Sequence, residues 1–579
     1  MSRRPSFMRG PSFVWWVLLV ALSSISCREK KTHPEEAPTT QGLSVGNESL
    51  PNLPAGLTIR LTPHPERAEV DVEVHLVGPA ATSIKEWTLA KSWAGIDGYS
   101  SIRSLHVRDA RGEIALKPGP DVGQDRTFLL ERPPLLEHVE LRYAVASAPP
   151  RAARFALHVD REGFSGVGHT FLLLPRLDKP IATFLQIRPN ALAAGATGVT
   201  SFGAGNDLEV SAFPQDVAHA VFAAGRLRTI ERPNAGRLLL LGRPSFDAEA
   251  THRTIMTAHR ALQTVFGPVQ SQDKPASFTY VLVAEPGLGK GHDGALLAHS
   301  FGLWIGNDSG LDGPTIIAAA HELAHSWFGG AVRLEDDGGV EQTWFAEGFA
   351  VHYARKIAWQ EKLVSAAEFA ADVERTVGIG SSDLAAHPMP RSREAYQRGA
   401  MYAAQLDAAI LRASKGARSL DDILRKVFTH RSSEPSARLS VSILRDLLIE
   451  ELGPASAEEL TWVMVQNHGE IRLDDETFGP CFSRTHTKTK VFELGFDRVA
   501  TMRPPQMIRG LVAGSAAAKA GLTEGALILS SKLPPEYDKS PDKQVEVVVA
   551  VRGRSKKIRY EPAGERDEIH WIVKKDCPN

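Results

Sequence analysis

The chain has 579 residues, of which 43% are hydrophobic and 23% are charged. A chain of this length is too long for one hydrophobic core and predicts about three or four domains. The formal net charge of −1 provides no basic excess to neutralise phosphates, so it argues against nucleic acid as a main partner.

The first 26 residues are typical of a secretory signal peptide. Arginines precede the apolar run "FVWWVLLVAL", and small residues follow it as far as Cys27. The run is shorter than the ~20 residues that a membrane-spanning helix needs. A cysteine after small residues resembles a bacterial lipoprotein signal, although Ser24 replaces the usual leucine, so simple cleavage stays an alternative. We expect an exported protein of the bacterial cell envelope, anchored to a membrane by a lipid on Cys27.

Residues 27–56 are polar, contain proline and glycine, and show no periodicity, which predicts a flexible linker. The other two cysteines, Cys481 and Cys577, lie late in the chain. In an oxidising envelope they could form a disulfide that closes the C-terminal region, but two free thiols are an open alternative.

Residues 57–232 show a β pattern. Val70, Val72 and Val74 alternate with charged residues, and residues 139–145 repeat the alternation. Breaks that contain proline and glycine separate these runs, which predicts an antiparallel sandwich or saddle domain. This region contains no catalytic cluster, so we expect it to support or shape a site elsewhere.

A mixed pattern begins at residue 233 and gives way to helices. Strand-like runs at 237–242 and 277–285 flank an amphipathic helix that should end at Gly267, and an edge strand is expected around "GALLAHSFGLWIG". Residues 401–480 are mostly helical, with Ser419 placed to cap a helix. We expect one domain at 233–400, a helical domain at 401–480 and a mixed domain at 481–579.

The stretch "AAAHELAHSWFGG", residues 318–330, contains the strongest chemical signal. On a helix, His321 and His325 lie one turn apart on one face, so both imidazoles can bind one ion. Glu322 is displaced round the helix but could take a proton from the attacking water. Pro314 suits the first turn and Gly329 the end, so the motif is expected in the middle of the helix. A structural helix with two incidental histidines is the alternative.

A third ligand is expected because catalytic zinc takes three protein ligands and leaves one position open. "TWFAEGFAVHYARKIAW" presents Glu347 among apolar residues, where an unpaired charge is costly. Glu335 and Glu341 are nearer in sequence, but they lie in a connection rich in glycine and aspartate and are expected to be solvated. The set His321, His325 and Glu347 therefore predicts a site for one Zn²⁺ ion.

"HELAHSWFG" followed by "WFAEGFA" resembles the gluzincin metallopeptidases, and the first motif is most similar to the aminopeptidase N family. Between His325 and Glu347 lie 21 residues, from Ser326 to Ala346, which is longer than that family's usual spacing. The order of the parts is similar to that of the glycyl aminopeptidase family. The resemblance implies a multidomain α+β fold with a β-rich N-terminal domain, a thermolysin-like gluzincin catalytic domain, a helical segment and a C-terminal PDZ-like domain.

The PDZ resemblance rests on "ELGF" and "GSAAAKAGLTEGALIL". It implies that the loop of Leu494, Gly495 and Phe496 could bind the C-terminal carboxylate of a peptide through backbone N–H groups. A degenerate PDZ fold that binds nothing and packs against the rest of the protein is the alternative.

Carried over to this chain, the gluzincin resemblance implies that Glu322 is the general base and that Tyr396, in "AYQRGAMY", donates a hydrogen bond to the oxyanion. One position departs from both families. Leu297 in "GALLAH" stands where a glutamate would bind the free α-amine of the substrate, and a leucine cannot neutralise an ammonium group. Asp293, Asp308 and a residue from elsewhere in the chain are the open alternatives for this amine-binding carboxylate.

Three functions remain open. The first is a zinc metallopeptidase that acts on peptides, in the manner of an aminopeptidase. The second keeps the chemistry but changes N-terminal recognition, as in an endopeptidase or a dipeptide-releasing peptidase. The third is a non-catalytic envelope scaffold that binds chain termini through its PDZ-like domain, but a scaffold would have no need of Glu322.

Overall fold

The computed structural model describes residues 51–577 with the exception of 136, 150–153, 233–235, 269–277, 286–290, 299, 307–309, 381–392, 431–436, 535–539 and 552. The expected signal peptide, Cys27 and most of the expected linker lie outside the described residues. The chain divides into two compact units, the first comprising Met1–Asp372 and Ile379–Leu473, the second comprising Val373–Gly378 and Asp474–Pro578. In the described part of the chain, no helix is both long and apolar enough to cross a membrane.

The first unit begins with a mostly antiparallel sheet. Its strands run in the order β15 (Asp207–Ala212), β12 (Ile181–Ile187), β1 (Gly56–His64), β2 (Glu69–Val77), β8 (His138–Ala146), β4 (Ile102–Asp109) and β5 (Gly112–Glu113). Val70, Val72 and Val74 of β2 are fully buried, while the residues between them turn their side chains to the other face. The alternation in the sequence therefore predicted this sheet correctly.

A second, small sheet lies next to the first sheet and contains β11 (Leu174–Pro175), β3 (Glu86–Ala90), β7 (Asp125–Leu130) and β6 (Leu116–Pro118). The two sheets share one hydrophobic core, in which Trp87, Leu174 and Val74 are buried. The short helix α2 (Pro214–Ala218) packs beside β11.

A third sheet joins the N-terminal region to the rest of the unit. Its strands run in the order β14 (Gly203–Ala204), β13 (Ala196–Thr200), β16 (Val221–Glu231), β17 (Arg237–Gly242), β18 (Thr279–Glu285), β20 (Ser300–Gly306) and β19 (His292–Leu297). Strand β16 pairs with β13 on one side and with β17 on the other. The boundary expected after residue 232 therefore coincides with the end of a strand inside one continuous sheet. Strand β19 is antiparallel to β20 and forms the edge of the sheet.

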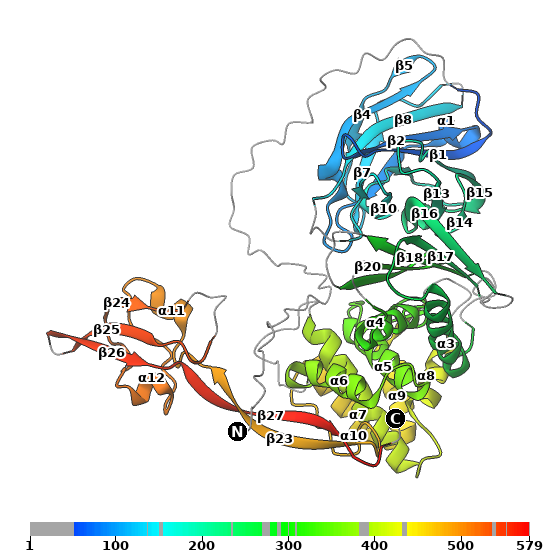
Figure 1. Cartoon of the computed structure of the whole chain (residues 1–579). Coiled ribbons are helices and arrows are strands. Elements are labelled where there is room, and N and C mark those ends of the chain that lie inside the picture. The colour runs from blue at the N-terminus through cyan, green and yellow to red at the C-terminus, as the bar shows by residue number, and fades with distance from the viewer. Residues whose placement is uncertain are drawn as a thin grey trace, which may run out of the picture. The chain divides into compact units, whose positions relative to one another are not determined.

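Helices α3 (Ala248–Phe266) and α4 (Gly313–Ala324) pack against this sheet on the side turned away from the N-terminal strands, and further helices follow along the chain (Figure 1). They are the π-helix η3 (Trp344–Phe349), α5 (Ala350–Gln360), α6 (Ala366–Gly380), α7 (Arg393–Ala413), α8 (Leu420–Thr429), α9 (Val441–Leu452) and α10 (Pro454–Leu460). Helix α3 ends at Phe266 and is followed by Gly267 with φ 78°, as expected. Ser419 caps α8 in a capping box with Asp422, which confirms its expected role.

The second unit contains a long antiparallel ribbon of β23 (Phe482–Phe492) and β27 (Ala563–Val573). Beyond the ribbon are α11 (Arg498–Met502), α12 (Ala516–Lys519) and a sheet of β24 (Ile528–Lys532), β25 (Val545–Val551) and β26 (Arg554–Tyr560). Their apolar side chains form a separate core. A disulfide joins Cys481 to Cys577 across 96 residues. The disulfide alternative of the sequence analysis is the one that the structure contains.

Loss of this disulfide should destabilise the second unit. Closing a loop of 96 residues restricts the unfolded chain, and such a restriction typically stabilises a domain by about 2–4 kcal/mol. We expect Cys481→Ser to lower the free energy of unfolding of the second unit by about 2–4 kcal/mol. This loss should appear as a lower denaturant midpoint, measured with probes in that unit. An unchanged midpoint, or mass spectra that show two free thiols in the untreated protein, would contradict the pairing.

Candidate metal centre

Helix α4 presents the two histidines at its C-terminal end. Asp312 caps the helix by accepting the N–H of Thr315, and Pro314 lies in the first turn as expected. The helix ends at Ala324, with His325 as the C-cap residue, so the prediction that the motif lies in mid-helix was wrong. The chain folds back early because Gly330 packs against the helix end. A β carbon on Gly330 would lie 2.3 Å from the carbonyl oxygen of His325.

The structure brings the three predicted metal ligands together. Nε2 of His321 lies 3.1 Å from Nε2 of His325. Oε2 of Glu347 lies 3.5 Å from the first nitrogen and 3.2 Å from the second. A tetrahedral zinc ion at about 2.0–2.1 Å from each ligand atom places those atoms about 3.3 Å apart. The donor set therefore fits Zn²⁺ in kind and in spacing.

A hydrogen bond from Nδ1 of His325 leaves Nε2 of this ring to bind a metal. Its Nδ1 lies 3.1 Å from the carbonyl oxygen of Phe328 and donates to it, so in the neutral ring Nε2 carries the lone pair that a metal would take. Burial lowers the pKa of His325, but the neighbouring Glu347 outweighs burial and raises that pKa to about 9. Burial alone would raise the pKa of Glu347. His321 and His325 outweigh this effect and hold the pKa of Glu347 well below its usual range. The site therefore favours an ionised carboxylate next to positive charge.

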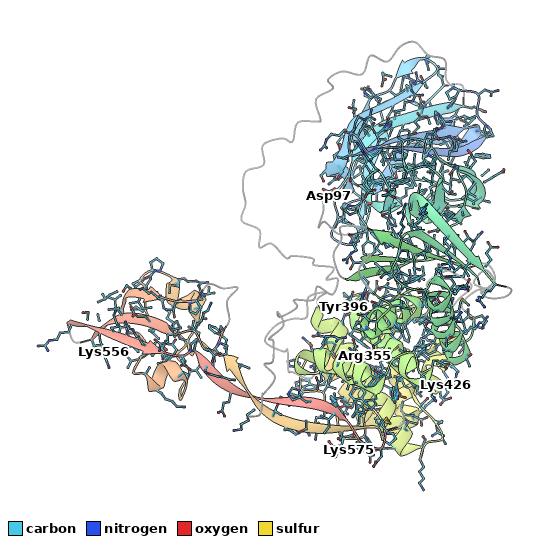
Figure 2. The ribbon with its side chains drawn as sticks, in the orientation of Figure 1. Asp97, Arg355, Tyr396, Lys426, Lys556 and Lys575 are labelled. Atoms are coloured by element: carbon cyan, nitrogen blue, oxygen red, sulfur yellow. A yellow bond between two sulfur atoms is a disulfide. The ribbon has the colours of Figure 1, made fainter. Side chains whose placement is uncertain are left out.

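Glu347 belongs to the π-helix η3, and Tyr396 belongs to the first turns of α7. The side chain of Tyr396 lies beside Glu347, and its ring centroid lies 6.2 Å from that of His321. Burial, followed by the charges of Glu347 and Glu322, raises the pKa of Tyr396, so the phenol stays protonated and can donate. Figure 2 labels Tyr396 at the end of the helical layer that adjoins the sheet.

A pair of glycines sets the distance between η3 and α7. A β carbon on Gly348 would lie 2.4 Å from the α carbon of Gly399, and one on Gly399 would lie 2.2 Å from the carbonyl oxygen of Trp344. The two backbones are thus in contact at the residues that follow Glu347 and Tyr396 in their helices. The sequence analysis missed this role, although both glycines stand in the quoted motifs "AEGFA" and "QRGAM".

Glu322 packs against the edge strand β19. A backbone N–H, that of Leu296, donates to the Glu322 carboxylate. A β carbon on Gly294 would lie 2.6 Å from Cγ of Glu322, so only glycine leaves room for this side chain. Burial and Glu347 raise the pKa of Glu322, while His321 and His325 lower it. The carboxylate is therefore held beside the donor set by a strand far from it in sequence.

Leu297 of β19 does not face the candidate metal centre. Alternate residues of β19 face opposite sides, and Gly294 and Leu296 face the helix layer. Leu297 faces the other side and is only 3% exposed, in a cluster with Phe155 and Trp304. Leu297 contributes no charge. The glutamate that the family resemblance implies at this position is therefore absent from this chain.

Of the two suggested substitutes for the missing glutamate, Asp308 lies outside the described residues. Asp293 is buried, and its Oδ2 forms an ion pair of 2.9 Å with Arg154. Burial raises the pKa of Asp293 to about 6, although Arg154 opposes that rise. A carboxylate whose charge is already matched by a guanidinium has little capacity left to attract the ammonium group of a substrate.

Other acidic groups do not compete as ligands. Glu335 pairs with Arg438 and Glu341 with Arg333 at the surface. A second cluster, Glu73, His75 and Glu140, has suitable spacing for a metal. Its carboxylates are nevertheless neutralised by three arginines, Arg60, Arg108 and Arg142. A dication would be repelled there.

In the second unit, Leu494 and Phe496 are buried in the core and Gly495 has φ 81°. The carbonyl oxygen of Leu494 accepts the hydroxyl of Tyr560. The chain then continues into the helix α11, whose N-cap is Asp497. The PDZ-like assignment and its peptide ligand stay predictions.

Comparison with known proteins gives the fold of the chain. The sequence matches no protein-family model, and no curated protein is significantly similar to it. Among solved structures, an aminopeptidase N family protein from Idiomarina loihiensis has a TM-score of 0.62 at 15% identity, covering 90% of this chain and 98% of its own. An M1 zinc metallopeptidase from Deinococcus radiodurans has a TM-score of 0.43 at 17% identity, over 72% of this chain and 95% of its own.

Yeast LTA4 hydrolase in complex with bestatin has a TM-score of 0.43 at 14% identity, over 72% of this chain and 68% of its own. These structural neighbours are M1 zinc metallopeptidases and LTA4 hydrolase. The likeness to the Idiomarina protein establishes the architecture expected from the sequence motifs: a multidomain α+β chain whose β-rich N-terminal region adjoins a sheet covered by helices. The chain shares the fold of the aminopeptidase N family.

Removal of Glu347 should weaken zinc binding. Glu347→Ala deletes one of three donors, so we expect the affinity for Zn²⁺ to fall at least about tenfold, as measured by competition with a chromogenic chelator. Glu341→Ala is the matched control because Glu341 is a nearby carboxylate that pairs with Arg333. Equal zinc affinity in the parent and Glu347→Ala would rule out this donor set.

Gly399→Ala should separate η3 from α7. The added β carbon would collide with backbone atoms that cannot rotate away, and overpacking of this kind costs about 1–3 kcal/mol. We expect a lower free energy of unfolding in denaturant titrations. Gly310→Ala serves as control because a β carbon on Gly310 meets nothing within 4 Å. If both variants are equally stable, the glycine contact does not set the helix spacing.

Proposed function

We propose that this chain is a zinc-dependent metallopeptidase that hydrolyses peptide bonds with activated water. The observation that carries this proposal is the convergence of His321, His325 and Glu347 beside Glu322. The shared fold with an aminopeptidase N family protein supports it.

The residues around the centre have separate roles in this proposal. His321, His325 and Glu347 would hold the ion, and bound Zn²⁺ would polarise the peptide carbonyl and lower the pKa of the attacking water. Glu322 takes the proton from that water and later delivers it to the leaving amine, because its carboxylate is fixed beside the donor set by Leu296.

Tyr396 would stabilise the charge that develops on the carbonyl oxygen. Its protonated hydroxyl lies beside Glu347 at the start of α7. A hydrogen-bond donor aimed at a developing oxyanion accounts for about 10²–10³ in rate in other hydrolases. The Gly348–Gly399 contact keeps this donor next to Glu347.

The sequence resemblance favours an aminopeptidase, but one observation favours a second candidate. Leu297 is buried in an apolar cluster, and Asp293 is matched by Arg154. These residues leave no carboxylate of β19 with its charge available to the α-ammonium group of a substrate. An endopeptidase or a dipeptide-releasing peptidase would not need such a carboxylate at that position.

A non-catalytic scaffold remains the third candidate. The half-buried position of Glu322 argues against it, since burial raises the pKa of this carboxylate and it forms no structural ion pair among the described residues. Export to the cell envelope with a lipid on Cys27 is also part of this proposal. The Cys481–Cys577 disulfide supports an oxidising compartment.

Glu322→Gln should separate catalysis from metal binding. The amide keeps the shape of the side chain but cannot accept the proton, so we expect peptide hydrolysis to fall at least about 10²-fold while zinc content stays at one ion per chain. Hydrolysis and zinc content are measured on the same preparation. Parent-like hydrolysis by this variant would refute the assignment of the base.

The N-terminal specificity can be measured with paired peptides. A library with free N-termini and the same library with acetylated N-termini differ only in the ammonium group. The apolar setting of Leu297 predicts that acetylation reduces kcat/KM by less than about threefold, since the loss of a buried ion pair would cost far more. A drop of a hundredfold or more would instead establish an aminopeptidase and require an amine-binding carboxylate elsewhere.

A further inference from the structure

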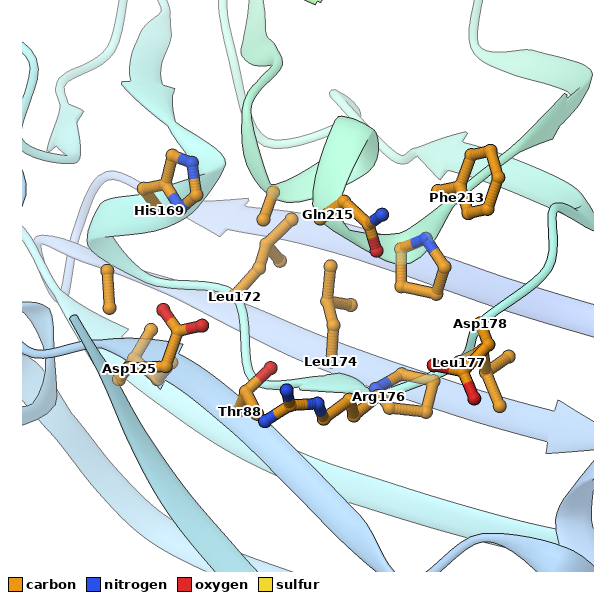
Figure 3. A pocket seen from close by; sticks show the side chains of 15 residues that line it. Thr88, Asp125, His169, Leu172, Leu174, Arg176, Leu177, Asp178, Phe213 and Gln215 are labelled. Atoms are coloured by element: carbon orange, nitrogen blue, oxygen red, sulfur yellow. The ribbon is translucent and has the colours of Figure 1, made fainter. Parts of the chain in front are cut away.

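The N-terminal region of the first unit contains a cavity of about 410 Å³. This volume lies within the usual range of small-molecule sites, about 300–1,000 Å³. It is bounded by β3, β7, β11 and α2, and Figure 3 shows its walls. None of the residues that line it belongs to the metal centre, and the proposed function does not use it.

One side chain of the cavity lining is the carboxylate of Asp125. Within the described residues, no hydrogen bond or ion pair reaches the side chain of Asp125, which is half-buried. Burial raises the pKa of Asp125, while the charges of Arg176 and Lys91 lower it. Beside it, burial lowers the pKa of His169 to about 3, so that imidazole is neutral and supplies no counter-charge.

The mouth of the cavity carries a guanidinium. Arg176 follows β11 and is exposed, and its guanidinium forms an ion pair of 3.7 Å with Glu86. In Figure 3 the guanidinium extends along the floor toward Thr88, on the side where Asp125 lies. The carboxylate of Asp125 and the guanidinium of Arg176 therefore line the same cavity. Each can accept an additional charged partner.

The remaining lining mixes apolar and polar side chains. Leu172 and Leu174 line the cavity but are almost fully buried, and Thr88, Asp178 and Gln215 are its polar members. A ligand that fits this cavity has an ammonium group and a carboxylate close together.

We propose that this cavity binds a free α-amino acid. Its ammonium group pairs with Asp125, and its carboxylate pairs with Arg176. A peptide N-terminus has the ammonium group but lacks the adjacent carboxylate, so it would pair with Asp125 and leave Arg176 without a ligand. Binding here does not require zinc.

The test uses calorimetry on the full zinc-loaded chain carrying Glu322→Gln, with L-leucine, L-leucinamide and N-acetyl-L-leucine. L-leucine should bind, and each analogue should bind about tenfold more weakly or worse because it lacks one charge-assisted contact. If leucinamide binds as well as leucine, Arg176 does not read a carboxylate and the site is one for peptide N-termini. If N-acetyl-leucine binds equally well, the role of Asp125 is wrong.

Variants locate the binding site. Asp125→Asn and Arg176→Met should each weaken L-leucine binding about tenfold, while Glu131→Gln should not change it. Glu131 is an exposed carboxylate just beyond β7 that pairs with Lys117, so it matches the charge change. Thermal unfolding of each variant verifies that it is folded, and Arg176→Met carries the test if Asp125→Asn is unstable.

Amino acids can also chelate zinc, so the metal centre is the competing location. L-leucine binding should persist in Glu347→Ala. Binding that is lost in Glu347→Ala but unchanged in Asp125→Asn would place the ligand at the metal and overturn the proposal. No measurable binding of L-leucine by any form would also overturn it. Neither result bears on peptide hydrolysis, which Glu322→Gln tests separately.

Discussion

The metal centre depends on one electrostatic constraint, which is that two imidazole nitrogens and a carboxylate oxygen face one another at 3.1–3.5 Å. Lone pairs directed at each other across such distances repel unless a proton or a cation lies between them. A single proton can satisfy one contact but not all three. A divalent ion satisfies the three together, which is why the arrangement indicates a metal rather than a structural cluster.

The rest of the site can be understood as the means of maintaining that convergence. The helix α4 ends where Gly330 packs against it, which places His325 at the helix terminus. Gly348 and Gly399 allow η3 and α7 to touch, so Glu347 and Tyr396 reach the same point from different helices. Gly294 leaves room for Glu322 against the edge strand. Each of these close approaches depends on the absence of a side chain.

Sequence reasoning predicted the donors and the β and helical regions because these depend on local patterns. Two histidines one helical turn apart, a carboxylate among apolar residues and a strict alternation along β2 can each be read within a short window. The early end of α4 could not be read in that way, because it results from a contact between Gly330 and the helix end. Gly348 and Gly399 both stand in the sequence motifs. Their contact could not be predicted because it joins two helices that are far apart in sequence. The partner of Asp293, Arg154, is 139 residues away from it.

The most direct measurement is the position of zinc in a crystal of the zinc-loaded protein, located by anomalous scattering at the zinc edge. We predict one peak per chain, at about 2.0–2.2 Å from Nε2 of His321, Nε2 of His325 and a carboxylate oxygen of Glu347. A peak bound by other residues, or no peak at this site in protein that contains one zinc per chain, would contradict the account.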